Sequence, residues 1–156
     1  MNYWLIKSEP ETYSWYDLVK LGRDKWDGVR NYAARNNMRS MKLGDLAFFY
    51  HSVNEKSIVG IAEVVNEHYA DPTTDDDRWS VVDFAPKRKL KRPISLNEIK
   101  PHPQLSEMVL LHNSRLSVQP VSEKEFNSII KLSESGLEWF ANSIALLQFN
   151  IVQVIE

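Results

Sequence analysis

Cysteine is absent from the 156-residue sequence, and glycine is scarce, with five residues. Without cysteine the chain forms no disulfide, no thiolate zinc site and no cysteine nucleophile. The sequence also has no Gly-rich phosphate loop, no dinucleotide fingerprint and no Gly-x-Ser-x-Gly elbow. These absences remove the signatures of several nucleotide-binding and hydrolytic enzymes, and we expect no cofactor.

Metal-binding patterns are missing as well. The four histidines, at positions 51, 68, 102 and 112, form no pair at helical spacing. The acidic run Asp75–Asp77 lacks the alternating ligands and the glycine of a calcium loop. We therefore predict no metal site, and we interpret the run Asp75–Asp77, within the acidic loop Asp71–Asp77, as solvated.

An excess of basic charge is also lacking, because 19 Lys and Arg face 21 Asp and Glu, for a net charge of −2. Proteins that coat the phosphate backbone usually show a clear basic excess. Charge alone therefore favours a protein that binds no nucleic acid. If this chain does bind one, we expect a local contact, with positive charge gathered on one face.

Long hydrophobic runs are absent. The uncharged stretch Trp139–Ile155 contains several polar residues, and a membrane span needs about 20 predominantly apolar residues. The first residues lack a basic segment and a small-residue cleavage site. We expect no membrane association, no signal peptide and a cytoplasmic protein.

The hydrophobic pattern predicts an α+β domain on a small, partly closed β-barrel. Capping boxes at Ser14, Ser95 and Ser122 predict three helix starts, and Gly22 is expected to end the first helix. Gly60, inside one apolar run, suggests a bulge or a close backbone approach. The predicted strands are Tyr3–Lys7, Leu46–His51, Ser57–Asn66, Trp79–Phe84 and Leu116–Val121.

The segment Trp26–Arg39 is the most unusual in composition. It combines one indole, one phenol, three guanidinium groups and three amides around Gly28. Such groups stack on planar rings, pair with phosphates and contact base edges. A helix with Ala33 and Ala34 inside and solvated arginines outside accounts for the same composition. The residues alone do not decide between these interpretations.

Two further segments carry candidate groups. His51 and Ser52 follow an apolar strand, and a hydrolase using His51 as a base is one alternative, although no carboxylate is placed by sequence to orient it. In Ser114–Val121, strand geometry would put Arg115, Ser117 and Gln119 on one face. That face would line a pocket or form a solvated edge.

Several motifs together resemble the EVE domain, a family of the PUA-like superfamily, over residues 1–132. They occur in the family's order and at similar spacing. The motifs are Tyr3–Pro10, Trp26–Arg39, Lys42–Asp45, Phe48–Ser52, Val59–Ala62 and Ser114–Val121.

The resemblance implies a PUA-like small mixed β-barrel with flanking short helices. It also implies a non-enzymatic module that holds a modified base of DNA or RNA in a polar and aromatic pocket. Ala33 stands where many relatives have Gln, which leaves the base preference open. The implied pocket residues are Ser8, Trp26, Asn31, Tyr32, Arg35, Asn36, Asn37, His51, Ser52, Arg115 and Ser117.

Phosphates near the base would be held by basic residues, which set position and salt dependence rather than identity. We assign this role to Arg30, Arg39, Lys87, Arg88 and Lys89. We expect a monomer or a weak dimer.

The tail Ser133–Glu156 extends beyond the resemblance, and we expect it to pack on the domain or on a partner. Two alternatives remain. One is an RNA- or nucleotide-processing enzyme using His51, and the other is a protein-interaction module using the tail.

Overall fold

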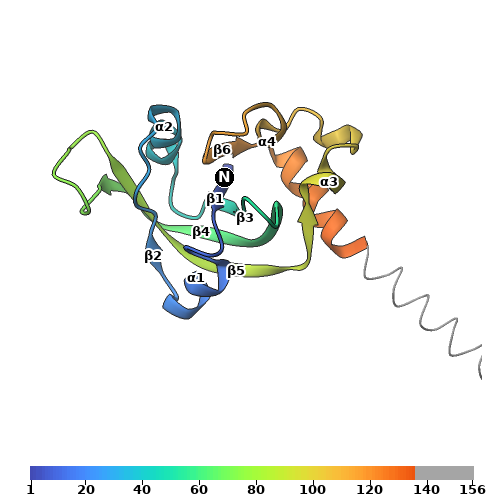
Figure 1. Ribbon diagram of the computed structural model, residues 1–156, viewed down its shortest axis with the longest axis horizontal. Coiled ribbons are helices and arrows are strands. Elements are labelled where there is room, and N and C mark those ends of the chain that lie inside the picture. The colour runs from blue at the N-terminus through green and yellow to red at the C-terminus, as the bar shows by residue number, and fades with distance from the viewer. Residues whose placement is uncertain (136–156) are drawn as a thin grey trace, which may run out of the picture.

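The fold is taken from a computed structural model that describes residues 1–135. Its centre is one six-stranded sheet in the order β2-β5-β4-β3-β1-β6 (Figure 1). Only β1 and β3 run parallel, and the other neighbours are antiparallel. The strands are β1 (Tyr3–Ser8), β2 (Asp24–Lys25), β3 (Leu46–His51), β4 (Ser57–Ala70), β5 (Ser80–Ser95) and β6 (Val118–Val121).

The expected α+β class is confirmed, but the sheet is open, so the word barrel describes it only loosely. Among the described residues, β2 and β6 are the two edges and no pairing joins them. The edge strands have two and four residues. Such short edges offer few ladder hydrogen bonds for closing a barrel.

Short helices surround the sheet, and the capping signals locate their starts correctly. Both hydrogen bonds of a capping box are present at Ser14, Ser95 and Ser122. Gly22 ends the first helix with a φ of 75°, a left-handed conformation that favours glycine. The helices are α1 (Trp15–Leu21), α2 (Tyr32–Ser40), α3 (Leu96–Ile99), the 3-10 turn η1 (Pro103–Leu105), α4 (Val109–His112) and residues 123–135.

Strands β4 and β5 are longer than the sequence predicted. They run on to Ala70 and Ser95 and form a long antiparallel pair with four register shifts. Each shift bends the ladder and increases its twist, which lets long strands curve around a core. The basic stretch 87–92 is therefore part of β5 and not a separate loop.

Successive side chains of a strand point to opposite faces of the sheet, and apolar residues on both faces form two hydrophobic clusters. Ile6 and Phe49 point into the first cluster, which α1 and α2 cover. Leu5 and Phe48 point into the second, which receives Phe126 of the helix 123–135. The first cluster matters for function because it supports the cavity described below.

At Gly60 of β4 the Trp15 side chain of α1 lies directly against the sheet. A Cβ atom built on Gly60 would lie 2.7 Å from the ring of Trp15. The register of β4 against β5 also shifts beside this residue. The register shift and the contact with Trp15 agree with the expectation of a bulge or a close approach at Gly60.

We expect Gly60→Ala to lower the free energy of unfolding by about 1–3 kcal/mol, because the new methyl overlaps a rigid buried ring. Urea denaturation of Gly60→Ala, Trp15→Ala and the double variant measures the effect. Removing the indole removes the overlap, so the double variant should be more stable than the sum of the single effects predicts. Additive effects would contradict this account.

Candidate functional site

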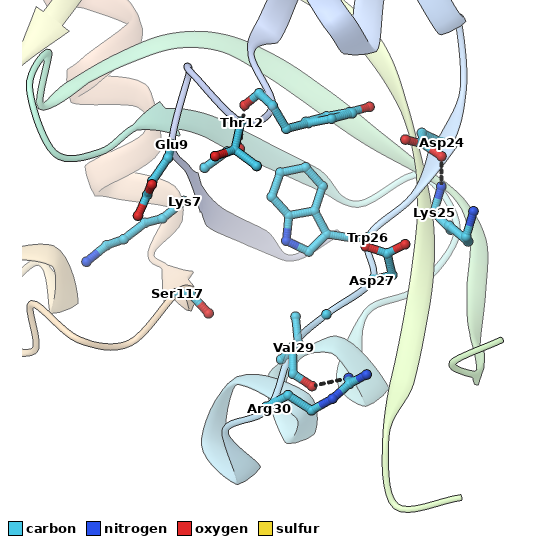
Figure 2. A pocket seen from close by; sticks show the side chains of 13 residues that line it. Lys7, Glu9, Thr12, Asp24, Lys25, Trp26, Asp27, Val29, Arg30 and Ser117 are labelled. Atoms are coloured by element: carbon cyan, nitrogen blue, oxygen red, sulfur yellow. Dashed lines mark hydrogen bonds between the residues drawn. The ribbon is translucent and has the colours of Figure 1, made fainter. Parts of the chain in front are cut away.

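A cavity of about 590 Å³ opens where the end of β1, the segment 12–13, β2 and the segment leading to α2 meet (Figure 2). Its volume lies in the range of small-molecule sites, about 300–1,000 Å³. The lining residues are Lys7, Ser8, Glu9, Thr12, Tyr13, Asp24, Lys25, Trp26, Asp27, Gly28, Val29, Arg30 and Ser117.

Trp26 forms the aromatic wall of this cavity. Its ring meets Tyr13, Phe49 and Phe84 edge to face, with centroids 5.5–5.9 Å apart. Its backbone N–H donates to the carbonyl of Val82 at 2.8 Å. Figure 2 shows the indole in the middle of the lining side chains. No hydrogen bond of its Nε1–H is found within residues 1–135, so a fixed ring presents a donor to the cavity.

The charges of the lining balance one another. Lys7, Lys25 and Arg30 carry positive charge, and the carboxylates come from Glu9, Asp24 and Asp27. A cavity with three charges of each sign suits a neutral polar guest better than a phosphate, which needs local positive charge.

Lys7 and Ser8, at the end of β1, are held by backbone carbonyls. The Lys7 ammonium donates to the carbonyl of Ser114 at 2.7 Å, and burial lowers the pKa of Lys7. The Ser8 hydroxyl donates to the carbonyl of Tyr13. Ser8 therefore fixes the backbone beside the cavity.

Tyr13 contributes a buried phenol. Its hydroxyl has no hydrogen-bond partner in the described part of the chain. Burial, reinforced by the nearby Asp24 carboxylate, raises the pKa of Tyr13. The phenol therefore stays protonated at neutral pH and remains a potential donor.

Asp71 fixes the segment 28–30, which forms one side of the cavity. One of its carboxylate oxygens accepts from the Gly28 N–H at 3.3 Å and from Arg30 at 2.9 Å, and the other accepts twice from Thr73. Burial alone raises the pKa of Asp71, but these hydrogen bonds outweigh it and lower the pKa to about 2. The Asp71 side chain is fully buried, whereas Asp75 and Asp77 of the same acidic loop are exposed, as expected.

The structure brings four of the sequence-predicted residues together at the cavity, namely Ser8, Trp26, Arg30 and Ser117. Sequence reasoning missed most of the lining. The missed lining residues lie close to Ser8, Trp26 or Arg30 along the chain, and this closeness was the available signal that they line the cavity. The missed residues are Lys7, Glu9, Thr12, Tyr13, Asp24, Lys25, Asp27, Gly28 and Val29.

The other candidates of the Trp26–Arg39 segment lie on α2, outside the lining. The Asn31 side chain caps α2 by accepting from the Ala34 N–H. Asn37 donates to the carbonyl of Val118 at 2.7 Å and thereby joins α2 to β6. Tyr32 and Arg35 lie on the outer side of α2, as does Asn36, whose side-chain oxygen accepts from Arg35 at 2.8 Å.

His51 and Ser52 also lie outside the cavity lining. His51 Nε2 accepts from the Trp15 N–H at 3.0 Å, so its Nδ1 carries the proton and donates to Glu55 at 2.8 Å. Both ring nitrogens are occupied, and the imidazole is 5% exposed. Ser52 borders a separate hollow of about 30 Å³.

The predicted polar face in Ser114–Val121 is wrong. Residues 114–117 form turns ahead of β6, so Arg115 is exposed in a turn, while Gln119 is buried. The Gln119 amide donates to the carbonyls of Asn113 and Leu116. Of this stretch, only Ser117 reaches the cavity.

The predicted phosphate-contacting residues lie in two places. Lys87, Arg88 and Lys89 are exposed on β5, where Lys87 pairs with Glu63 at 3.3 Å and Lys89 donates to the Tyr16 hydroxyl at 2.7 Å. Arg39 lies on α2 and donates to the Ser80 hydroxyl at 2.9 Å; Arg30 lines the cavity, as described above.

Residues 1–135 contain no group of three or more His, Asp or Glu placed to hold a metal ion. In the same range, no helix is long and apolar enough to span a membrane. The predictions for the tail concern residues that lie almost entirely outside the described part of the chain.

We expect Asp71→Asn to lower the free energy of unfolding at pH 7 by about 1.5–3 kcal/mol, the range for hydrogen bonds to a charged group. The folded pKa of about 2 lies below the unfolded value of about 3.9. This stabilisation is therefore complete above about pH 4 and is lost as the pH falls toward 2. Urea denaturation should show a smaller difference in unfolding free energy between wild type and Asp71→Asn at pH 3 than at pH 7. Asp75→Asn, on the same loop, is the control. A difference independent of pH would contradict the assignment.

Several known proteins are similar to this chain in sequence and in structure. Mouse thymocyte nuclear protein 1 is 41% identical over 168 residues, covering 86% of this chain and 74% of that protein. The structure of protein Atu2648 from Agrobacterium tumefaciens matches with a TM-score of 0.84 and 44% identity, covering 85% of this chain and 93% of that one.

A human structure matches with a TM-score of 0.80 and 38% identity over 86% of this chain and 98% of the other. It is the human THYN1 protein in complex with 5-methylcytosine-containing DNA. The sequence profile of the EVE domain matches residues 2–132. The chain therefore belongs to the EVE domain family.

Proposed function

We propose that this protein holds one modified base of a nucleic acid in the cavity beside Trp26 and releases it unchanged. The observation that carries the proposal is the fixed indole with its Nε1–H inside a charge-balanced cavity. Family membership supports it, and so does the human relative that was crystallised with 5-methylcytosine-containing DNA.

The energetics favour recognition through the shape and edge of the base. Extruding a base from a stack costs a few kcal/mol, and less when the strand is already single. Stacking on an aromatic ring returns about 1–3 kcal/mol per base. Because these two contributions nearly cancel, preference for one base must come from the walls and polar groups of the cavity.

The lining supplies both apolar walls and polar groups for contact with a base. Trp26 and Val29 offer apolar surface to a methyl group, and the neighbouring carboxylates and ammonium groups offer acceptors and donors to a base edge. A methyl group that meets a fitting apolar wall gives about 1–3 kcal/mol, a preference of tenfold or somewhat more. A neutral base also avoids the repulsion that three carboxylates would exert on a phosphate.

We expect Trp26→Ala to abolish the preference for a modified base over the plain base. Calorimetry at fixed salt with paired oligonucleotides, containing 5-methylcytosine or cytosine in DNA and in RNA, measures both affinities. Because Trp26 packs against the core, Trp26→Phe provides a second variant that keeps an aromatic wall and lacks the N–H. An unchanged preference in both folded variants would contradict the proposal.

Arg88→Ala should weaken both members of each oligonucleotide pair equally, because a phosphate contact positions the strand without reading the base. Arg88 is exposed on β5 and takes part in no salt bridge within residues 1–135. Its loss should therefore leave the melting temperature unchanged. A selective loss of the modified oligonucleotide would overturn this division of roles.

A further inference from the structure

A stack of aromatic and guanidinium groups covers the outer side of α2 and the loop before β5. Tyr32 is 51% exposed and lies on Trp79, with ring centroids 5.2 Å apart and an interplanar angle of 27°. The Arg35 guanidinium lies 4.8 Å from the centre of the Tyr32 ring. Such contacts hold a guanidinium in one plane.

Arg35 and Arg39 converge on a single oxygen. Nη1 of Arg35 and Nη2 of Arg39 each donate to the carbonyl of Arg78 at 3.1 Å. Two positive groups that share one acceptor lie close together and repel each other. Their remaining hydrogen bonds go to the neutral oxygens of Asn36 and Ser80.

No carboxylate compensates this pair. Neither arginine forms a salt bridge in the described part of the chain, whereas the neighbouring Arg30 and Arg78 pair with Asp71 and Asp76. The exposed Asp75 and Asp77 belong to the same loop as Asp76 but lie outside salt-bridge distance of both guanidinium groups. The pair therefore keeps two positive charges at the surface, which an anion between them would neutralise.

The stack is continuous with the cavity. The Arg30 guanidinium lies 5.6 Å from the centre of the Trp79 ring, and Arg30 also lines the cavity. The stack therefore borders the part of the cavity wall that Arg30 forms, and the backbone beside a bound base can pass over it. Planar guanidinium groups bind phosphate oxygens through two parallel hydrogen bonds.

We propose that Arg35 and Arg39 together bind a backbone phosphate next to the base held in the cavity. Tyr32 positions Arg35 for this contact. The inference rests on the proposed function and deepens it. It removes Arg35 from the predicted base pocket and gives it a role in strand binding.

The test measures how affinity depends on salt, using a DNA oligonucleotide with one 5-methylcytosine and its unmodified counterpart. Each lost phosphate contact reduces the slope of log K against log salt by about 0.7–0.9. We expect Arg35→Gln and Arg39→Gln each to reduce the slope by this amount. Arg35→Lys keeps the positive charge, so its slope should stay close to that of the wild type.

Lys124→Gln is the matched control. It also removes one positive charge, from the helix 123–135, which Figure 1 shows at the opposite end of the molecule from α2. Melting temperatures of all variants separate binding from folding. An unchanged slope in the double variant Arg35→Gln/Arg39→Gln, or an equal fall in Lys124→Gln, would overturn the inference.

The two proposals fail differently. If the wild-type protein does not distinguish the modified oligonucleotide from the plain one, the proposed function fails, whatever the slopes are. If the preference persists while the slopes of the arginine variants equal that of the wild type, only the phosphate assignment fails. Retention of the wild-type preference by the arginine variants, with reduced slopes, supports both.

Discussion

The edge-to-face contacts of Trp26 with Phe49 and Phe84 tie the wall of the cavity to the centre of the sheet. Phe49 belongs to β3 and Phe84 to β5, so one indole spans two strands that β4 separates. Protein interiors are packed nearly as densely as organic crystals and resist local rearrangement. The wall of the cavity thus shares the rigidity of the core, although Trp26 follows a strand, β2, of only two residues.

Around this fixed wall, the polar residues of the segment 26–39 divide into three groups. Trp26 and Arg30 face the cavity. Asn31 and Asn37 face the protein itself, one capping α2 and one joining it to β6. Tyr32, with the arginines of α2, faces solvent. Trp26 and Arg30 precede α2. Within α2, successive side chains point about 100° apart around the helix axis, so Asn37 can face the protein while Tyr32 and Arg35 face solvent.

The sequence predicted well what is decided within a few residues. The capping boxes at Ser14 and Ser95 need only a hydroxyl and a carboxylate three positions apart, and both form as expected. Strand ends were less predictable. The exposed residues 87–89 gave no sign that β5 continues, because its partner β4 supplies the ladder from about 30 residues away.

Site residues were hardest where their partners are distant in the chain. Nothing near Asp71 shows that it accepts from Gly28 and Arg30, more than 40 residues earlier. His51 likewise owes its orientation to the Trp15 N–H, 36 residues away. The family resemblance identified the segment 26–39, but only packing showed which of its side chains face the cavity.

The place of β1 in the sheet has a consequence for the order of folding. β1 pairs with β3 on one side and with β6 on the other, so Tyr3 lies opposite Val121. Pairings between such distant segments form late, because a long loop must close first. During synthesis the pairing of β1 with β6 therefore waits until nearly the whole domain has left the ribosome, whereas its pairing with β3 needs only the first 51 residues. The Lys7 N–H bonds to the carbonyl of Ser117, and both residues line the cavity. The cavity is thus completed by one of the last contacts to form, and its lining stays incomplete in a nascent chain until β6 is made.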